Sequence, residues 1–329
     1  MTAVGIIFGG ANSEHEVSCN SARSVAEHLD RDAFDLVLLG IDRDGGWHRV
    51  GLVDELAEAG AGAQFPDLAG VDVAFPVLHG RFGEDGTVQG LLELTGLPYV
   101  GCGVLASALA MDKAIAQRLL SADGIPTIPP VAVTASTTEA AVAAAEDFGY
   151  PVFVKPNRAG SSVGVSRVDS AADLPAALDL ALSHDRVALL QQAVTGDEVD
   201  LGVLQLPSGE LIVGAPLRIL SKTSEFFDYA AKYTAGATEL EVPARIADGV
   251  LERLVQHAKS AFRSLDCEGL ARVDFFVTPA GDIMLNEVNT LPGLTAFSQF
   301  PRMWQAKGIS YTDLLSLLIE RATVARPAG

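Results

Sequence analysis

Short apolar runs alternate with amphipathic stretches along the first hundred residues. The runs Val4–Phe8, Phe34–Ile41 and Val71–Leu78 are almost entirely apolar, as strands buried on both faces of a parallel sheet are. A helix is expected from about Glu16 to Leu29, after the glycines that end the first run. This alternation predicts an α/β domain over residues 1–102.

A second unit is expected over residues 103–190, where alanine-rich periodic segments alternate with glycine-rich breaks. Its expected elements are a helix at Asp112–Ala122, an alanine-rich helix ending near Phe148, strands at Pro151–Lys155 and Val163–Val168, and a helix from Ala171 to about Ser183.

A third unit is expected over residues 191–329, opening with two long β-type runs and containing a polar loop at about 221–239. Its expected elements are strands at 198–206 and 211–220, a long helix at 246–265, strands at 271–275 and 285–289 joined by a turn at 278–282, and a closing helix from Thr312.

Four polar side chains stand on the last two strands, where an apolar sheet would otherwise continue. Side chains alternate along a strand, so Arg272 and Asp274 share one face of the first strand, and Glu287 and Asn289 share one face of the second. The turn places Asp274 opposite Asn286 or Glu287, with Arg272 near Asn289. Two carboxylates this close repel unless a cation holds them, and an all-oxygen set suits Mg²⁺. One arginine–aspartate pair would indicate a structural salt bridge, but four groups together indicate metal–phosphate chemistry.

A lysine at a strand end is followed by a glycine- and serine-rich loop in the segment VKPNRAGSSVG (154–164). Glycines let a backbone approach phosphate oxygens, and Lys155 supplies a positive charge. The loop is neither a Walker loop nor a GxGxxG turn, and by itself it could be structural. Together with a metal site it favours nucleotide binding, with Lys113 as a second candidate phosphate ligand.

Composition narrows the class of protein. The chain has 329 residues, 49% of them hydrophobic, which is enough for two or three domains with real cores. Its net charge of −19 argues against nucleic-acid binding. Three scattered cysteines argue against a disulfide frame or a zinc site, and no apolar run predicts a membrane span. A soluble protein of the reducing cytoplasm is expected.

Taken together, these segments resemble the D-alanine–D-alanine ligase family of ATP-grasp enzymes over essentially the whole chain. The motifs that carry the resemblance, in order, are GGANSEHEVS (9–18), HGRFGEDGTVQG (79–90), MDK (111–113), VKPNRAGSSVG (154–164), FDYAAKY (227–233), RVDF (272–275) and NEVNTLPGLTAFS (286–298). The resemblance implies an ATP-grasp fold with an N-terminal Rossmann-like α/β domain (1–102), a central small α+β lid domain (103–190) and a C-terminal α+β catalytic domain (191–329) with a closing loop at about 221–239.

The resemblance also implies an activity, cofactors and partners. The expected reaction joins two D-alanine molecules through a D-alanyl phosphate, converts ATP to ADP and phosphate, and serves peptidoglycan synthesis, and thereby cell-wall biogenesis and cell shape. ATP and two Mg²⁺ ions are the expected cofactors, with Mn²⁺ as a substitute. A cytoplasmic homodimer is expected, without nucleic-acid or membrane partners.

Residue roles follow from the resemblance, position by position. The expected metal ligands are Asp274, Glu287 and Asn289. The expected ATP contacts are Lys113, Lys155, Ser162, Gln191, Gln192, Val194, Glu198 and Lys232. Glu14 is expected to receive the ammonium group of the first D-alanine, with Ser161 and Tyr233 as its partners. Arg272 and the Gly293 N–H are expected to form an oxyanion hole. Ser298 is expected to bind the carboxylate of the second D-alanine, and His79 is expected near this second substrate as a proton acceptor or carboxylate contact.

Some positions depart from the family pattern. Gln191 stands where glutamate is common beside adenine, and Gln299 stands where an apolar residue usually faces the second D-alanine. Gln299 leaves open a ligase that uses D-lactate or another D-amino acid as its second substrate, although Tyr233 favours an amine nucleophile. A nucleotide-binding regulator without catalysis is a further alternative, but the metal, phosphate and oxyanion positions are intact. A nicotinamide dehydrogenase fails, because GxGxxG and the later ribose acid are missing.

Overall fold

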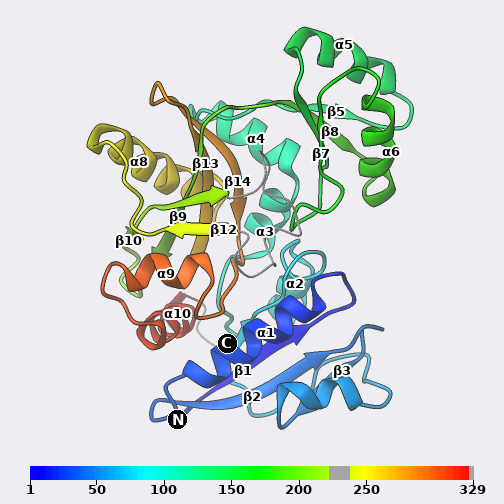
Figure 1. Cartoon of the computed structure of the whole chain (residues 1–329). Coiled ribbons are helices and arrows are strands. Elements are labelled where there is room, and N and C mark those ends of the chain that lie inside the picture. The colour runs from blue at the N-terminus through cyan, green and yellow to red at the C-terminus, as the bar shows by residue number, and fades with distance from the viewer. Residues whose placement is uncertain (222–237, 326–329) are drawn as a thin grey trace.

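The chain folds around three separate β-sheets, which Figure 1 shows as three groups of strands. The computed structural model describes residues 1–221 and 238–325. Within these ranges, no helix has the length and apolar character that crossing a membrane requires.

The first sheet confirms the parallel strands expected near the N-terminus. Its strands are β1 (Thr2–Gly9), β2 (Phe34–Ile41), β3 (Trp47–Val50) and β4 (Val73–Pro76). They lie in the order β3-β2-β1-β4, and β1 is parallel to both β2 and β4. The sequence does not predict β3, because its residues WHRV form no apolar run and are only partly buried. The helices of this region are α1 (His15–His28), the 3-10 helix η1 (Val53–Glu58) and α2 (Thr87–Thr95).

The second sheet is antiparallel and has the order β5-β8-β6-β7. Its strands and covering helices are β5 (Val131–Val133), α5 (Thr138–Phe148), β6 (Val152–Pro156), β7 (Ser166–Val168), α6 (Leu174–His184) and β8 (Ala188–Gln192). β7 is shorter than the expected strand at 163–168, because Val163 and Val165 donate their N–H groups to backbone turns of the glycine-rich loop. The expected boundary at 190/191 falls within β8, so Gln191 and Gln192 belong to this sheet; the three-domain division remains a prediction.

The third sheet contains the charged hairpin. Its strands are β9 (Asp197–Gln205), β10 (Leu211–Val213), β11 (Leu217–Ser221), β12 (Thr238–Glu241), β13 (Leu270–Val277) and β14 (Ile283–Asn289). The order is β12-β11-β9-β13-β14, with β10 also paired to β9. The expectation of one strand over 211–220 was wrong, because the chain breaks between Val213 and Leu217, where Pro216 has no N–H for a ladder hydrogen bond.

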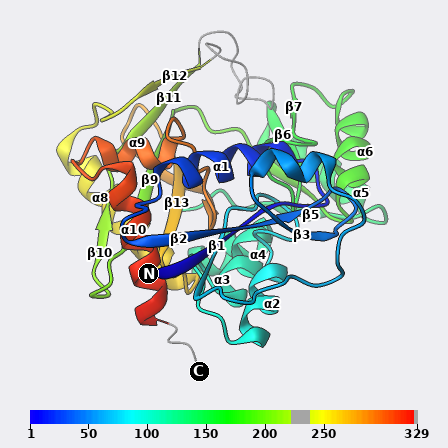
Figure 2. The ribbon, with the colours of Figure 1, turned by 90° about the horizontal axis from the view of Figure 1, so that it is seen from below.

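Of the remaining described helices, two lie between the first and second sheets along the chain, one lies between β12 and β13, and two follow β14. They are α3 (Val104–Met111), α4 (Lys113–Ala122), α8 (Asp248–Ser264), α9 (Gln299–Gln305) and α10 (Tyr311–Ala325). Leu314, Leu318 and Ile319 of α10 join the same buried apolar cluster as Val4 and Phe75 of the first sheet. Figure 2 shows α10 running beside the N-terminal strands. The end of the chain therefore completes the core of its beginning.

Candidate active site

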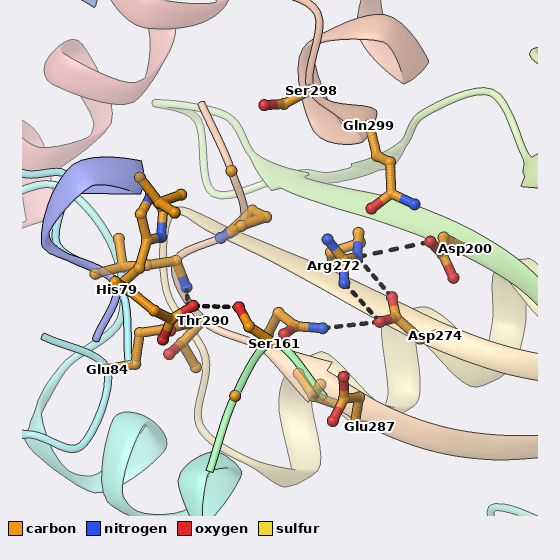
Figure 3. A pocket seen from close by; sticks show the side chains of 18 of the residues that line it. His79, Glu84, Ser161, Asp200, Arg272, Asp274, Glu287, Thr290, Ser298 and Gln299 are labelled. Carbon is orange, nitrogen blue, oxygen red and sulfur yellow. Dashed lines mark hydrogen bonds and ion pairs between the residues drawn. The ribbon is translucent and has the colours of Figure 1, made fainter. Parts of the chain in front are cut away.

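Two adjoining cavities lie between the sheets. The first, of about 470 Å³, is bounded by the start of α1, the loop at 79–86 and the loop at 290–299, above β13 and β14. The second, of about 640 Å³, lies between the second and third sheets. Lys113, Ser161, Glu198 and Glu287 line both cavities, so the two spaces meet at these residues. Figure 3 shows the first cavity from close by.

The charged hairpin has one of the two registers expected from the sequence, because a register shift between Asp274 and Phe275 selects Glu287 over Asn286. Arg272 pairs with Asn289, and Asp274 pairs with Glu287, across β13 and β14. Asp274 accepts two 2.7 Å hydrogen bonds from the Arg272 guanidinium, at Oδ1 from Nε and at Oδ2 from Nη2. Asn289 Nδ2 donates to Asp274 Oδ2 at 2.9 Å. Burial opposes the charged form of Arg272, but Asp274 outweighs it and raises the pKa, so the guanidinium stays charged.

The donor set of the hairpin fits a hard divalent cation. Asp274 and Glu287 are directly opposed carboxylates, and Asn289 lies one step along the same face. Among the described residues no three His, Cys, Asp or Glu side chains are arranged to hold a metal. Two carboxylates and one amide fill only part of the octahedral shell of Mg²⁺. The remaining coordination positions would be open to phosphate oxygens and water, as in Mg²⁺ sites beside nucleotides.

Both candidate phosphate lysines reach the β14 edge of the sheet. Lys113 Nζ lies 3.5 Å from Glu287 Oε2 and donates to the Ala159 carbonyl at 2.7 Å. Lys155 Nζ donates to Asn286 Oδ1 at 3.5 Å. One ammonium group thus stands beside the Glu287 carboxylate and the other beside the adjacent Asn286, where phosphates would meet them.

The start of α4 and the glycine-rich loop are fixed to each other. Asp112 caps α4 by accepting from the Ile115 N–H at 3.1 Å, and Arg158 donates to its other oxygen at 2.8 and 2.7 Å. Asn157 Oδ1 accepts from the Ala114 N–H at 2.9 Å. Burial would raise the pKa of Asp112, but the hydrogen bonds from Asn157 and Arg158 hold it below its usual value. This docking holds Lys113 at the junction of the two cavities.

Glu14 and Ser161 meet across the first cavity. The Ser161 hydroxyl donates to Glu14 Oε1, joining the N-terminal region to the glycine-rich loop. Ser161 has a left-handed backbone, with a φ of 51°, which turns its side chain back toward the cavity. The pairing expected from the resemblance is therefore present. Tyr233, its other expected partner, and Lys232 lie outside the described residues.

His79 is buried in the wall of the same cavity. Its Nε2 lies 3.0 Å from Ser21 Oγ, and its side chain is 5% exposed. Burial lowers the pKa of His79, and the nearby Glu14 charge only partly offsets this effect. The ring is therefore neutral near pH 7, with one nitrogen able to accept a proton.

Glu84 is a site residue to which the sequence reasoning gave no role. Its Oε2 accepts from the Gly80 N–H at 2.7 Å, and its Oε1 faces the Leu291 N–H at 3.4 Å. Burial, with a further contribution from the Glu14 charge, raises the pKa of Glu84 to about 8. The signal was present in the motif HGRFGEDG, which holds an acidic residue five positions after the histidine.

The loop after β14 brings Gly293, Ser298 and Gln299 to the other end of the cavity. A Cβ atom at Gly293 would lie only 3.1 Å from Ser298 Oγ, so glycine allows the loop to close against the serine. Ser298 Oγ accepts from the Thr295 N–H at 3.1 Å and lies 2.7 Å from Thr295 Oγ1. In Figure 3 the Gln299 amide points toward Arg272 and Asp200.

The second cavity collects the expected nucleotide contacts. Its walls include Ser162, Gln191, Gln192, Val194 and Glu198. Gln191 is buried and its Nε2 donates to the Ile128 carbonyl at 2.5 Å, which leaves Oε1 as the acceptor of this side chain.

The chain has the ATP-grasp fold: two adjoining cavities lie between β-sheets covered by helices, and the charged hairpin lines both cavities. The structure is similar to the VanG D-Ala:D-Ser ligase from Enterococcus faecalis, with a TM-score of 0.86 and 38% identity, covering 98% of this chain and 99% of that chain. It is also similar to the D-alanine–D-alanine ligase from Bacillus anthracis complexed with ATP, with a TM-score of 0.79 and 28% identity over 99% of both chains.

Sequence comparison identifies the family. Family models described as D-ala D-ala ligase N-terminus and C-terminus match residues 3–102 and 119–320. The D-alanine–D-alanine ligase of Mycobacterium sp. (strain KMS) is 42% identical, with 100% of this chain and 98% of that protein covered. That of Mycobacterium tuberculosis (strain ATCC 25177 / H37Ra) is 43% identical, with 99% and 96% covered. The chain therefore belongs to the D-alanine–D-alanine ligase family, as the sequence motifs predicted.

Proposed function

We propose that this protein joins two D-alanine molecules into D-alanyl-D-alanine, using ATP and releasing ADP and phosphate, for peptidoglycan precursor synthesis. One observation carries the proposal: Glu14 with Ser161, and Arg272 with the Asp274–Glu287 pair, line a single cavity that opens onto a second one. An ammonium group and a reacting carboxyl group can therefore be held at the same time. Relatives with this activity in their names match the chain over its whole length.

The second cavity is the proposed ATP site. Gln191, Gln192 and Val194 would contact adenine, and Glu198 would contact the ribose hydroxyls. The phosphates would extend toward Lys113, Lys155 and Ser162, at the junction with the first cavity. Lys232 would place a further positive charge beside the phosphates. An ATP complex of a related ligase supports the use of this nucleotide.

Asp274, Glu287 and Asn289 are the proposed ligands of two Mg²⁺ ions, which Mn²⁺ could replace. Bound there, the metal would neutralise the charge of the phosphates. The two lysines would add positive charge at the same end of the nucleotide.

The first cavity is the proposed substrate site. Glu14 would hold the ammonium group of the first D-alanine, while the substrate carboxylate attacks the γ-phosphoryl group and forms an acyl phosphate. The amine of the second D-alanine would then attack the acyl carbon and expel phosphate. Arg272 and the Gly293 N–H would stabilise the oxyanion that forms, and oxyanion donors are typically worth about 3–4 kcal/mol each.

Two residues are assigned to the second D-alanine. Ser298 would bind its carboxylate, with the hydroxyl oriented by Thr295. His79, neutral because burial lowers its pKa, would accept a proton or contact the carboxylate. His79 lines the same cavity as Glu14 and is close enough to respond to its charge, which supports a role near the substrates.

A cytoplasmic homodimer of three domains completes the proposal, with the expected loop at about 221–239 closing over the cavities. Residues 222–237 of that loop lie outside the described residues, and its ends belong to β11 and β12. The need to exclude water from an acyl phosphate supports such a closure. Limited proteolysis of the loop should slow when ATP and D-alanine are present. Sedimentation velocity would test the dimer.

The function is tested by measuring phosphate release with ATP, Mg²⁺ and D-alanine, and by identifying the product by mass. We expect D-alanyl-D-alanine from D-alanine alone. Arg272→Lys, which cannot make the paired hydrogen bonds to Asp274, should lower kcat by about 100-fold or more. Product only when D-serine or D-lactate is added would favour a different second substrate, a candidate that the polar Gln299 and the similarity to a D-Ala:D-Ser ligase support. No product with any pair would overturn the proposal.

A further inference from the structure

Asp200 stands in a row of three carboxylates that crosses the third sheet. It lies on β9 directly opposite Asp274 of β13, which is itself opposite Glu287 of β14. Directly opposed residues of antiparallel strands point to the same face. The next row along the sheet is Gly202, Arg272 and Asn289, so the cation of that row lies beside Asp274 and Asp200.

Asp200 and Asp274 are both almost completely buried, with 1% and 2% of their surfaces exposed. Buried carboxylates that share a site need a cation, and Arg272 is within reach of both. Arg272 contacts the two carboxylates at different distances. Its Nε lies 2.7 Å from Asp274 Oδ1 but 3.7 Å from Asp200 Oδ2, which is an ion-pair distance rather than a hydrogen bond.

Arg272 therefore holds the same carboxylate that the proposed metal site requires. An Mg²⁺ ion binds its oxygen ligands at about 2.0–2.1 Å, a distance at which guanidinium donors on the same oxygens compete with it. Asn289 also donates to Asp274, so three of the roughly four lone-pair positions of this carboxylate already accept hydrogen bonds. A divalent cation on the same carboxylate would also repel the Arg272 guanidinium, which weakens the Arg272–Asp274 pair.

We propose that Asp200 is a positioning residue for Arg272, which receives the guanidinium when Asp274 binds the divalent cation. The proposal rests on the metal site of the proposed function. In this arrangement the Arg272 guanidinium turns from Asp274 on its own strand toward Asp200 on β9, staying above the sheet. The oxyanion donor is then held in place by a carboxylate that does not touch the metal.

Asp274, and not Asp200, is the direct neighbour of Glu287 across the strands. Neighbouring strands are about 4.8 Å apart, so two intervals separate the backbones of Asp200 and Glu287 by roughly 10 Å. Asp200 lies at an ion-pair distance from Arg272, and we assign it a role through that residue.

The test is a double-mutant cycle that measures Mn²⁺ binding by electron paramagnetic resonance, with ADP present. Asp200→Asn should weaken Mn²⁺ binding about tenfold, a usual effect of removing a partner of a metal ligand. In an Arg272→Gln background, where nothing competes for Asp274, the same substitution should change the affinity by less than about twofold. Asp282→Asn removes a charge from the exposed hairpin turn of the same sheet and is the matched control, with no change expected.

Each result decides between explanations. An equal loss of affinity in both backgrounds would mean that Asp200 acts only through its charge, and no loss in either would mean that it does not act at all; both overturn the proposal. If the unsubstituted protein bound no Mn²⁺ with ADP, the metal site itself would be wrong. A crystal structure with Mg²⁺ and ADP needs no variant: the Arg272–Asp200 distance should shorten to a hydrogen bond, and an unchanged Arg272–Asp274 pair would overturn the proposal.

Discussion

At the scale of single residues, Glu84 of the first cavity has a protonation state that depends on its neighbours. Burial and the Glu14 charge raise its pKa to about 8. At neutral pH this side chain is mostly protonated in the folded protein, whereas an exposed glutamate would be ionised. The cavity therefore holds less negative charge than its sequence suggests.

Glu84 should make the protein less stable as the pH rises from about 4.5 to about 8, the ordinary and the folded pKa of this group. In this window the unfolded chain has lost the proton that the folded chain keeps, so the free energy of unfolding falls with pH and levels off above about 8. Urea unfolding of the unsubstituted protein and of Glu84→Gln between pH 5 and 9 would measure the difference. The variant should lack this part of the slope.

Glu139→Gln, which alters an exposed residue in the first turn of α5, is the matched control and should keep the full slope. A stability difference between the unsubstituted protein and Glu84→Gln that did not vary with pH would contradict the assignment.

Site residues were predictable where a local pattern marks them. Alternation along two strands was enough to group Arg272 with Asp274 and Glu287 with Asn289. The turn alone leaves Asp274 opposite Asn286, and a register shift after Asp274 brings Glu287 opposite it instead. The Glu14–Ser161 hydrogen bond was predictable only from the family resemblance, since no local pattern relates residues so far apart in sequence. Asp200 received no role, because a single acid in an apolar strand does not show which strand will lie beside it.

At the scale of elements, α4 and the glycine-rich loop act as one unit. The helix cap Asp112 is also the acceptor for Arg158 of the loop. A change at the cap therefore affects both the helix start and the position of Lys113, the first residue of α4.

Asp112→Ala should lower the free energy of unfolding by about 1–2 kcal/mol, the usual cost of losing an N-cap, and should raise the KM for ATP because Lys113 is no longer held in place. Chemical denaturation and steady-state kinetics would measure the two effects. Asp123→Ala, at the other end of the same helix, is the control and should alter both values little. An unchanged KM for ATP with reduced stability would show that the cap is purely structural.

Helices and strands with strong periodicity were predicted well, and interrupted ones were not. α1, β1, β2 and α8 were expected within a few residues of their bounds, because each has a clear apolar pattern. The break between β10 and β11 was missed because Gly214 and Ala215 look like part of an apolar run. Their N–H groups instead bond to the carbonyls of Gly202 and Met303, and the second of these is a tertiary contact that no local pattern shows.

At the scale of the whole molecule, the first sheet depends on the last helix. Leu318 is 1% exposed and belongs to the cluster that contains Val4, Ile6 and Phe75. The sequence indicated an apolar closing helix, but not which sheet it covers, because helix periodicity does not specify a partner.

Leu318→Ala should lower the free energy of unfolding by about 2–5 kcal/mol, the range for truncating a buried leucine. Hydrogen exchange should show lost protection in β1, β2 and β4 as well as in α10. Leu180→Ala on α6, where the side chain is 45% exposed, is the control and should cost much less. Faster exchange confined to α10 would contradict the shared core.

The shared core of the first sheet and α10 also has a consequence for how the chain is made. Synthesis delivers β4 long before α10, which begins at Tyr311, and at cellular rates the interval is on the order of tens of seconds. During that time the apolar surface destined for α10 has no permanent cover while the nascent chain is still attached to the ribosome. The N-terminal region should therefore be a preferred binding site for ribosome-associated chaperones, and its final packing should be one of the last events after release.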